Sequence, residues 1–254
     1  MVDPMAGAGT ILVEAAALGR RAIGVEVEGR WVDLARANIE HVLDARHQAR
    51  ADVIQADARI LPDLLGQLTG RVDLIATSPP YACDAGVIDK PAWRQGKSLC
   101  DKDSLNYSSA KANLGHARGQ VYLEAMAEIY AACHEVLRPG GLLVTVTKNT
   151  RRAGRCFDLA GATVALAQEA GLSYLQHVVA LLGAIRDGAL VARPSFWQLT
   201  QHRRALARGE PAHLVVHEDV CIFSKAPAAV DSEGTTAGRV ARASKASRAS
   251  DPIP

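Results

Sequence analysis

Apolar and polar residues alternate along the chain in blocks whose spacing predicts strands and helices. Runs of consecutive apolar residues indicate buried strands, and apolar residues spaced three and four apart indicate amphipathic helices. The strands predicted in this way are 22–27, 51–55, 72–76, 141–147, 174–181 and 215–223. The predicted helices are 11–18, 31–43, 60–68, 121–136 and 157–170. Strands that alternate with helices predict an α/β fold, in which helices cover both faces of a mostly parallel sheet.

Two segments interrupt this alternation. Residues 82–120 are polar and follow no regular period, and residues 183–212 are rich in arginine. Segments of this length inside a compact domain are usually functional or disordered, so both are candidate recognition insertions. From residue 226 onward the chain is rich in Ala, Ser, Arg and Gly, a composition typical of disorder. The sequence therefore predicts one domain over 1–225 and a disordered tail over 226–254.

The start of the chain is abrupt for this kind of fold. Only Met1 and Val2 stand before Asp3 as a candidate first strand, whereas a central buried strand normally has about five residues. We therefore expect that the start is truncated, that the start codon is misassigned, or that another segment completes this strand.

Composition and charge exclude several classes of protein. The 254 residues carry a formal net charge of +2, so any basic surface for a polyanion has to be local. The five cysteines are scattered without a C-x-x-C pair, which argues against a zinc module or a disulfide framework and fits a reducing cytoplasm. The first residues lack the charged-then-apolar pattern expected of a signal peptide, and no apolar stretch of about 20 residues is present. We expect a cytoplasmic protein that contacts no membrane and holds no metal.

A glycine-rich segment follows the first strand and precedes the first predicted helix. It reads Asp3-Pro4-Met5-Ala6-Gly7-Ala8-Gly9-Thr10. Glycines let the backbone turn sharply and approach a ligand closely. Leu12 breaks the G-x-G-x-x-G fingerprint of dinucleotide-binding folds, and the Asp3 carboxylate would repel a pyrophosphate. An acid here suits a ligand with a positive amino group, such as the methionine part of S-adenosylmethionine. The alternative is a glycine-rich turn capped by an aspartate.

Two further acids end the next two predicted strands. Glu26 is placed to accept hydrogen bonds from ribose hydroxyls, and Asp57 from an adenine amino group. The alternatives are a solvated surface glutamate and a helix N-cap aspartate. Together with Asp3, these acids indicate one crevice outside the carboxyl edge of the sheet, where open α/β sheets bind ligands.

The segment Ser78-Pro79-Pro80-Tyr81 follows the fourth predicted strand. Two prolines make a rigid turn, which could direct the Ser78 hydroxyl and the Pro79 carbonyl at one point. Acceptors placed there would draw both hydrogens of an exocyclic amino group and free its lone pair for direct attack on a methyl group. Tyr81 would then stack on the flipped-out base. The alternative is a proline turn with a packing aromatic ring.

These motifs together resemble those of the amino-directed DNA methyltransferases, which act on N4 of cytosine or N6 of adenine. The cofactor loop of that family reads D-P-x-x-G-x-G-T, and its catalytic tetrapeptide reads Ser/Asn/Asp-Pro-Pro-Tyr/Phe/Trp, as at Ser78 to Tyr81. The resemblance covers about 1–180 and 215–225 and implies a Rossmann-like methyltransferase fold with a late antiparallel strand. It implies that S-adenosylmethionine is held by Asp3, Pro4, Ala6, Gly7, Gly9, Thr10, Glu26 and Asp57.

The resemblance implies DNA as the partner, with a catalytic set of Ser78, Pro79, Pro80 and Tyr81. Serine in the first catalytic position favours cytosine N4 over adenine N6. Related transfer-RNA methyltransferases that modify guanine N2 share both motifs, although they usually have aspartate first, so RNA remains an alternative. The family also has a further cofactor-pocket element upstream of the loop. We therefore expect a partner or a missing N-terminal segment to complete the pocket, and a non-catalytic binding subunit is a third hypothesis.

Candidate contacts to the nucleic acid come from later in the chain. Lys148 and Asn149 follow the fifth predicted strand, and Arg193, Arg203 and Arg204 lie in the arginine-rich insertion. Cationic side chains there could hold phosphates, or they could be solvated surface residues. Cys83 lies close to the catalytic turn, and we interpret it as incidental.

Overall fold

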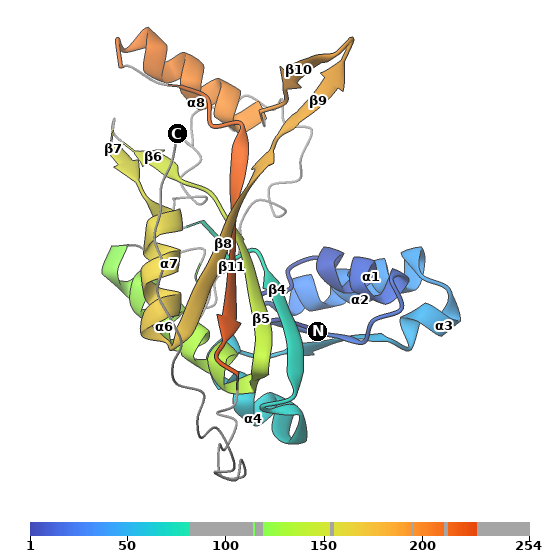
Figure 1. The fold of residues 1–254 in the computed structure, drawn as a ribbon. Coiled ribbons are helices and arrows are strands. Elements are labelled where there is room, and N and C mark those ends of the chain that lie inside the picture. The colour runs from blue at the N-terminus through green and yellow to red at the C-terminus, as the bar shows by residue number, and fades with distance from the viewer. Residues whose placement is uncertain (82–113, 115–118, 153–154, 195, 211–212, 228–254) are drawn as a thin grey trace, which may run out of the picture.

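The computed structural model describes residues 1–81, 114, 119–152, 155–194, 196–210 and 213–227. Their centre is a seven-stranded sheet with the strand order β3-β2-β1-β4-β5-β11-β8 (Figure 1). The strands are β1 (Val2–Asp3), β2 (Ala22–Glu26), β3 (Ala51–Gln55), β4 (Val72–Thr77), β5 (Leu137–Thr147), β8 (Leu172–Leu181) and β11 (His217–Lys225). Strands β1 to β5 are parallel, and β11 runs antiparallel between β5 and β8. The predicted fold class, with its late antiparallel strand, is confirmed.

Helices cover both faces of this sheet. They are α1 (Thr10–Ala17), α2 (Gly29–Val42), α3 (Ala45–Gln48), α4 (Leu61–Leu65), α6 (Gly119–Val136), α7 (Leu159–Glu169) and α8 (Phe196–Ala207). One apolar cluster packs α1 and α2 against β2 and β3 through side chains such as Leu12, Val32 and Val53. A larger cluster packs α4, α6 and α7 against the rest of the sheet around Ile75, Tyr130 and Phe223. Helices α1, α2, α4, α6 and α7 each bury an apolar face in one of these two clusters.

Strand β1 has two residues and still occupies the middle of the sheet. Val2 pairs with Ile23 of β2 on one side and with Ile75 of β4 on the other. Both Val2 and Asp3 are buried. The short first strand expected from the sequence is therefore present in its predicted position. Its completion by another segment stays a prediction.

Local chemistry moves several predicted boundaries. The helix predicted over 60–68 is divided into η1 (Ala58–Ile60), α4 and η2 (Gly66–Leu68), because Gly66 adopts a φ of +50° that a continuous helix does not allow. The helix predicted from residue 157 begins at Leu159, since Asp158 caps it by accepting a hydrogen bond from Gly161 N. Phe157 belongs instead to β7 (Arg155–Phe157), which pairs with β6 (Thr150–Arg152).

The segment 183–212 contains regular structure that its polar composition did not predict. A hairpin of β9 (Gly183–Arg186) and β10 (Ala189–Ala192) is followed by α8. Most of the other predicted insertion, 82–120 with Cys83, and of the predicted tail, 226–254, lies outside the described residues. Within the described part of the chain, no helix is long and apolar enough to cross a membrane.

Candidate active site at the carboxyl edge of the sheet

The predicted site residues meet at one edge because parallel strands end on the same side of a sheet. Asp3 ends β1 and Glu26 ends β2, while Asp57 stands two residues beyond β3. Thr77 ends β4, so the segment that begins at Ser78 leaves the sheet at this edge as well. The structure therefore brings together the glycine loop, the three acids and the proline turn, as the sequence predicted.

The glycine loop has a conformation that only glycines allow without strain. Gly7 has a φ of +51° and Gly9 a φ of +79°. A Cβ on Gly9 would lie 2.9 Å from the Cβ of Ala35 in α2, whereas a Cβ on Gly7 would meet open space. The side-chain amide of Asn38 donates to the Ala8 carbonyl over 2.8 Å and holds the loop against α2. The loop is thus fixed on its inner side and open on its outer side.

Glu26 ties this loop to the end of β2. Its Oε2 accepts a hydrogen bond from Gly7 N at 2.9 Å, and its Oε1 accepts one from Glu28 N at 2.9 Å. Partial burial raises the pKa of the Glu26 carboxyl, and these two N–H donors lower it in part. The sequence predicted a ribose contact for Glu26 but did not predict its structural role in the loop. The ribose contact stays a prediction.

Asp3 is a buried acid at the centre of the edge. Its side chain is 1 % exposed, and Oδ1 accepts a hydrogen bond from Met5 N at 3.1 Å. Burial raises the pKa of the Asp3 carboxyl to about 7, although the Thr77 hydroxyl and Met5 N–H lower it. Within the described residues Asp3 forms no ion pair. A ligand with a positive amino group would satisfy this carboxylate, so the residues present fit S-adenosylmethionine.

Asp57 is engaged by its own neighbour in the chain. Arg59 Nη2 lies 2.6 Å from Oδ2 and Arg59 Nε lies 3.0 Å from Oδ1. Asp57 Oδ1 also accepts from Arg59 N at 2.9 Å and so caps η1. The Arg59 guanidinium lowers the pKa of the Asp57 carboxyl. The helix-cap alternative therefore describes Asp57 in this structure, and its contact to adenine stays a prediction.

The proline turn combines one exposed and three more enclosed residues. Ser78 is exposed, Pro79 is buried, and Pro80 and Tyr81 are half-buried. The Tyr81 ring packs against the larger apolar cluster, and its hydroxyl donates to Glu218 Oε1 at 3.2 Å. Glu218 lies near the start of β11 and was missed from the sequence, because no local pattern relates that strand to the turn. Stacking of Tyr81 on a base stays a prediction.

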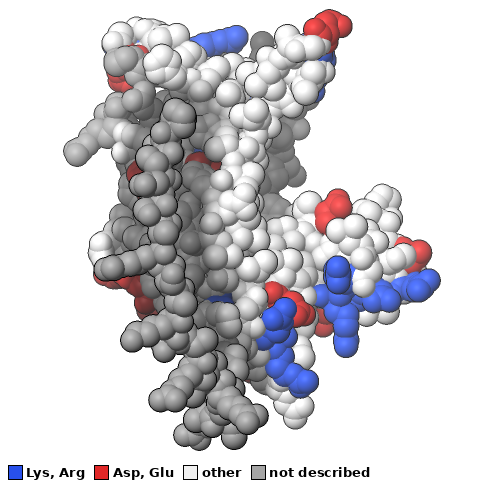
Figure 2. Space-filling model, viewed as in Figure 1, with Lys and Arg blue, Asp and Glu red and all other residues white. Residues whose placement is uncertain are grey.

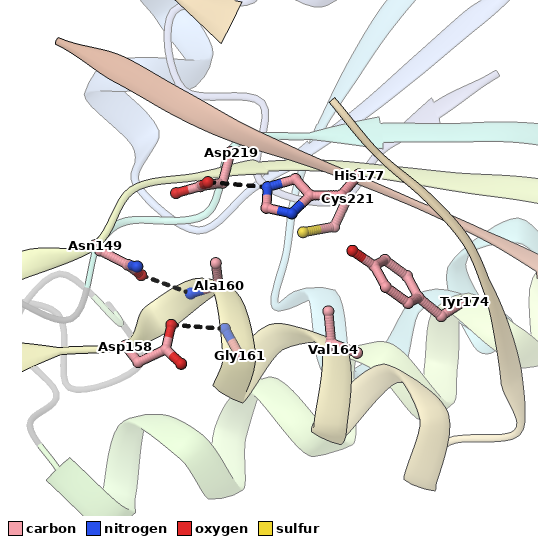
Figure 3. Close-up of a pocket in the computed structure, with 9 residues that line it drawn as sticks. All are labelled: Asn149, Asp158, Ala160, Gly161, Val164, Tyr174, His177, Asp219 and Cys221. Atoms are coloured by element: carbon pink, nitrogen blue, oxygen red, sulfur yellow. Dashed lines mark hydrogen bonds and ion pairs between the residues drawn. The ribbon is translucent and has the colours of Figure 1, made fainter. Parts of the chain in front are cut away.

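Lys148 and Asn149 lie where β5 ends at the same edge. Lys148 is 8 % exposed, and burial lowers the pKa of its ammonium while the nearby charges of Glu218 and Asp219 raise it. Asn149 Oδ1 accepts a hydrogen bond from Ala160 N at 2.9 Å, which caps α7 (Figure 3). The side chain of Asn149 is thus occupied in supporting α7. Contact of either residue with substrate stays a prediction.

The three predicted arginines lie outside the seven-stranded sheet. Arg193 follows β10, while Arg203 and Arg204 lie on α8, and all three are exposed. The hairpin and α8 lie beyond the carboxyl end of β5 (Figure 1). At this end of the sheet β8 ends and the antiparallel β11 begins. On the face shown in Figure 2, basic side chains gather mostly around α3 and the lower end of the sheet, and few lie near α8. Among the described residues, no group of His, Cys, Asp or Glu is arranged to hold a metal ion.

Comparison with known proteins finds a methyltransferase family model and two methyltransferases that are similar in sequence. Residues 1–87 match the family model described as RMKL-like, methyltransferase domain. The tRNA (guanine(10)-N2)-dimethyltransferase of Methanothermobacter thermautotrophicus is 32% identical over 108 residues, which are 42% of this chain and 29% of the relative. The release factor glutamine methyltransferase of Mycobacterium leprae is 31% identical over 144 residues, which are 56% of this chain and 43% of the relative. The chain thus spans less than half the length of each of these relatives.

Solved structures agree on the fold. An S-adenosylmethionine-dependent methyltransferase from Methanosarcina mazei aligns with a TM-score of 0.50 and 12% identity, over 89% of this chain and 92% of that one. The [4+2]-cyclase SpnF also aligns with a TM-score of 0.50, at 16% identity, over 89% of this chain and 75% of that one. These two proteins differ in reaction, so the fold by itself assigns none.

The family comparison supports the predicted function at a coarser level than the motifs did. The family model that matches is the RMKL-like one, and it supports a methyltransferase without supporting the finer prediction of an amino-directed DNA methyltransferase. The prediction of a methyltransferase is confirmed at the coarser level. Taken together, residues 1–87 match a methyltransferase family model, and the sheet with its helices has the fold of S-adenosylmethionine-dependent methyltransferases.

Proposed function

We propose that this chain methylates the exocyclic amino group of a nucleic-acid base, with N2 of guanine in RNA as the favoured acceptor. The observation that supports it is the Ser78–Tyr81 turn, which leaves β4 beside Asp3 at the edge where the cofactor loop lies. The two relatives that are similar in sequence are named as enzymes that methylate guanine N2 and glutamine, which adds support. Guanine N2 and the glutamine side-chain nitrogen are both NH2 groups bonded to an sp2 carbon.

Such a nitrogen needs its lone pair released from conjugation before it can attack. The exposed Ser78 hydroxyl and the Pro79 carbonyl are hydrogen-bond acceptors in one rigid turn. Two acceptors at the amino hydrogens would draw the nitrogen toward tetrahedral geometry, and Tyr81 would hold the ring of the base. Bound S-adenosylmethionine supplies the methyl group. The Ser78–Tyr81 turn contributes orientation and electrostatic stabilisation, with no covalent link to the base.

The crevice acids would hold the cofactor in this mechanism. Asp3 would bind its amino group and Glu26 its ribose hydroxyls, while Gly7 and Gly9 allow close approach of the loop. Asp57 would reach the adenine amino group with an oxygen that Arg59 also contacts. Each assignment rests on the position of the residue at the carboxyl edge.

DNA is the second candidate substrate, and one residue favours it. Serine in the first position of the turn resembles the cytosine-N4 DNA enzymes, whereas guanine-N2 RNA enzymes usually have aspartate there. The 32% identity to a tRNA methyltransferase weighs in favour of RNA. The two candidates predict different labelled products and are therefore separable in one assay.

The test uses the full chain with tritiated S-adenosylmethionine and three acceptors: unmodified tRNA, unmethylated duplex DNA and a glutamine-containing peptide. Label in N2-methylguanosine after nucleoside digestion is the expected result. Label in N4-methylcytosine would replace RNA with DNA, and label in the peptide alone would refute a nucleic-acid substrate. Ser78→Ala should lower transfer strongly while cofactor binding is unchanged. The matched control is Ser173→Ala, an exposed serine on β8.

A further inference from the structure

A pocket lies between α7 and strands β8 and β11, apart from the glycine loop and the proline turn. Its volume is about 350 Å³. The residues that decide its chemistry are Asp158, which caps α7, and Val164 within α7, Tyr174 and His177 from β8, and Asp219 and Cys221 from β11 (Figure 3). None of the residues that line it belongs to the loop 3–10 or to the turn 78–81. The proposed methyl-transfer site leaves this pocket unexplained.

Asp219 is the unusual group in this pocket. Its side chain is buried, with the whole residue 4 % exposed. Oδ1 lies 2.9 Å from Nε2 of His177, which holds the carboxylate in place, and His217 Nε2 is 3.8 Å from the same oxygen. Oδ2 is buried with no hydrogen-bond partner within the part of the chain that the structure describes. Because buried acceptors are nearly always paired, Oδ2 favours a ligand that brings an N–H donor.

The other residues that line the pocket limit the chemical class of the ligand. The Tyr174 ring and Val164 are apolar surfaces that suit a flat ring. Burial raises the pKa of the Cys221 thiol to about 11, so this side of the pocket is neutral at pH 7. Asp158 Oδ1 already accepts from Gly161 N at 2.9 Å. Two carboxylates in one pocket repel phosphate and favour a ligand that presents N–H donors, and the Tyr174 and Val164 walls suit a planar one.

Part of the pocket lining lies level with the edge that carries the proposed chemistry. Asp219 pairs with Thr147, the last residue of β5, and so stands level with the carboxyl ends of the parallel strands. Strand β11 is two strands away from β4, a separation of roughly 10 Å at the usual strand spacing. A nucleotide chain whose target base lies at Ser78 therefore has other bases within reach of this pocket.

We propose that the pocket binds a second nucleobase of the polynucleotide, one beside the methylated base, through hydrogen bonds from that base to Asp219. This inference rests on the proposed function. Guanine is the best match, because its N1–H and N2–H2 donors lie side by side and a carboxylate can accept both. Uracil offers one donor, and 1-methylguanine loses the N1–H. We therefore expect guanosine to bind with higher affinity than uridine or 1-methylguanosine.

The test measures nucleoside binding without methyl transfer. The full chain, saturated with S-adenosylhomocysteine, is titrated with guanosine, uridine and 1-methylguanosine while the His177 imidazole is followed by NMR. Guanosine should shift the His177 signal, with at least tenfold weaker binding of the other two. Asp219→Asn should weaken guanosine binding at least tenfold, because its NH2 group can occupy the position of Oδ2. Val164→Phe fills the pocket without touching Asp219 and should weaken binding as strongly. The matched control is Asp63→Asn, an exposed aspartate on α4.

Three outcomes would overturn the inference. They are an unshifted His177 signal with all three nucleosides, an unchanged guanosine affinity in Asp219→Asn, and an unchanged affinity in Val164→Phe, which would mean that guanosine binds elsewhere. The failure of the proposed function has a different signature. A chain that binds guanosine here with the expected order but methylates no nucleic acid would refute methyl transfer and leave the base-binding pocket supported.

Discussion

The hydroxyl of Tyr81 donates a hydrogen bond to Glu218 across 3.2 Å, although the two residues are 137 positions apart in the chain. The bond joins the turn after β4 to the antiparallel strand β11 and crosses over the end of β5. Together with the packing of the Tyr81 ring on the apolar core, it fixes the ring at both ends. A tyrosine held in this way is fixed in advance for the base stacking that we propose for it.

Removing the hydrogen bond between Tyr81 and Glu218 should weaken the binding of the nucleic acid by a modest factor. A hydrogen bond of this kind contributes about 0.5–1.5 kcal/mol, so Tyr81→Phe and Glu218→Ala should each raise KM for the nucleic acid about two- to tenfold. Glu218→Gln retains an acceptor and should stay near the wild type. Steady-state methylation assays on the single and double variants check this. Losses that add in the double variant would show that the two residues act independently.

Glu26 should control cofactor affinity, because it anchors the glycine loop and faces the crevice. Glu26→Ala removes the acceptor of Gly7 N–H and Glu28 N–H. Charge-assisted hydrogen bonds contribute about 1.5–3 kcal/mol, so the dissociation constant for S-adenosylhomocysteine should rise about ten- to a hundredfold. Isothermal titration calorimetry measures it, with the exposed Glu40→Ala on α2 as the matched control. An unchanged affinity would remove Glu26 from the cofactor site.

Cofactor binding should depend on pH through Asp3. Burial raises the pKa of this carboxyl from its usual 3.8 to about 7, and a cationic amino group beside it favours the ionised form. Binding then releases a proton, so affinity should rise with pH up to about 7, by at most about tenfold per unit, and level off above that. Calorimetry across this range checks it, and Asp3→Asn should give a flat profile.

The raised pKa of Asp3 also predicts how the free energy of unfolding of the cofactor-free protein depends on pH. The native state holds the Asp3 proton more tightly than the unfolded state does. The contribution of Asp3 is therefore greatest below about pH 4 and is lost as pH rises through about 7. The free energy of unfolding of wild type and of Asp3→Asn, measured by denaturation at several pH values, isolates the contribution of Asp3. A difference between them that does not change with pH would contradict the raised pKa.

Gly24 should be intolerant of any side chain. A Cβ there would lie 2.6 Å from Leu12 Cδ1 and 2.8 Å from the Cβ of Ala6, in the packing between β2 and α1. Overpacking of this kind costs about 1–3 kcal/mol of unfolding free energy. Gly24→Ala should lower the urea midpoint accordingly. The control Gly29→Ala, whose new Cβ meets only the flexible end of Gln55, should leave the midpoint nearly unchanged.

The exposed arginines of α8 should contribute to affinity through phosphates. Replacing Arg203 and Arg204 with alanine should weaken nucleic-acid binding uniformly across sequences. The slope of log affinity against log salt should decrease by about 1–2, as two phosphate contacts are lost. Filter binding at several salt concentrations measures the slope. Arg46→Ala on α3 serves as the control, since an exposed arginine remote from the carboxyl edge should leave the slope unaltered.

The fold and the cofactor edge could be predicted because their signals are local. Apolar runs mark β2, β3 and β4, and the rule that parallel strands end together places Asp3, Glu26 and Asp57 at one edge. Asp57 also shows the limit of this reasoning. The arginine two positions later engages its carboxylate, and a position at the edge does not reveal which partner a side chain will choose.

The contribution of β11 could not be predicted, because it depends on register. Asp219 pairs with Thr147 of β5 and with Val179 of β8. A shift of one residue in this ladder would send Asp219 and Glu218 to opposite faces from those they occupy. The apolar pattern of residues 215–223 predicts a strand but gives neither its neighbours nor its alignment. Both acids of β11 therefore become visible only in three dimensions.

The insertion of β11 between β5 and β8 also sets the timing of maturation during synthesis. A ribosome adds roughly 5–20 residues per second, so Tyr81 is made on the order of ten seconds before its partner on β11. Strands β5 and β8 are both made before β11. Until β11 is added, the half-finished sheet exposes unpaired strand edges to other nascent chains. The strands that carry the glycine loop and the proline turn are thus made early, but the sheet closes, and Tyr81 gains its partner, only when β11 has been added.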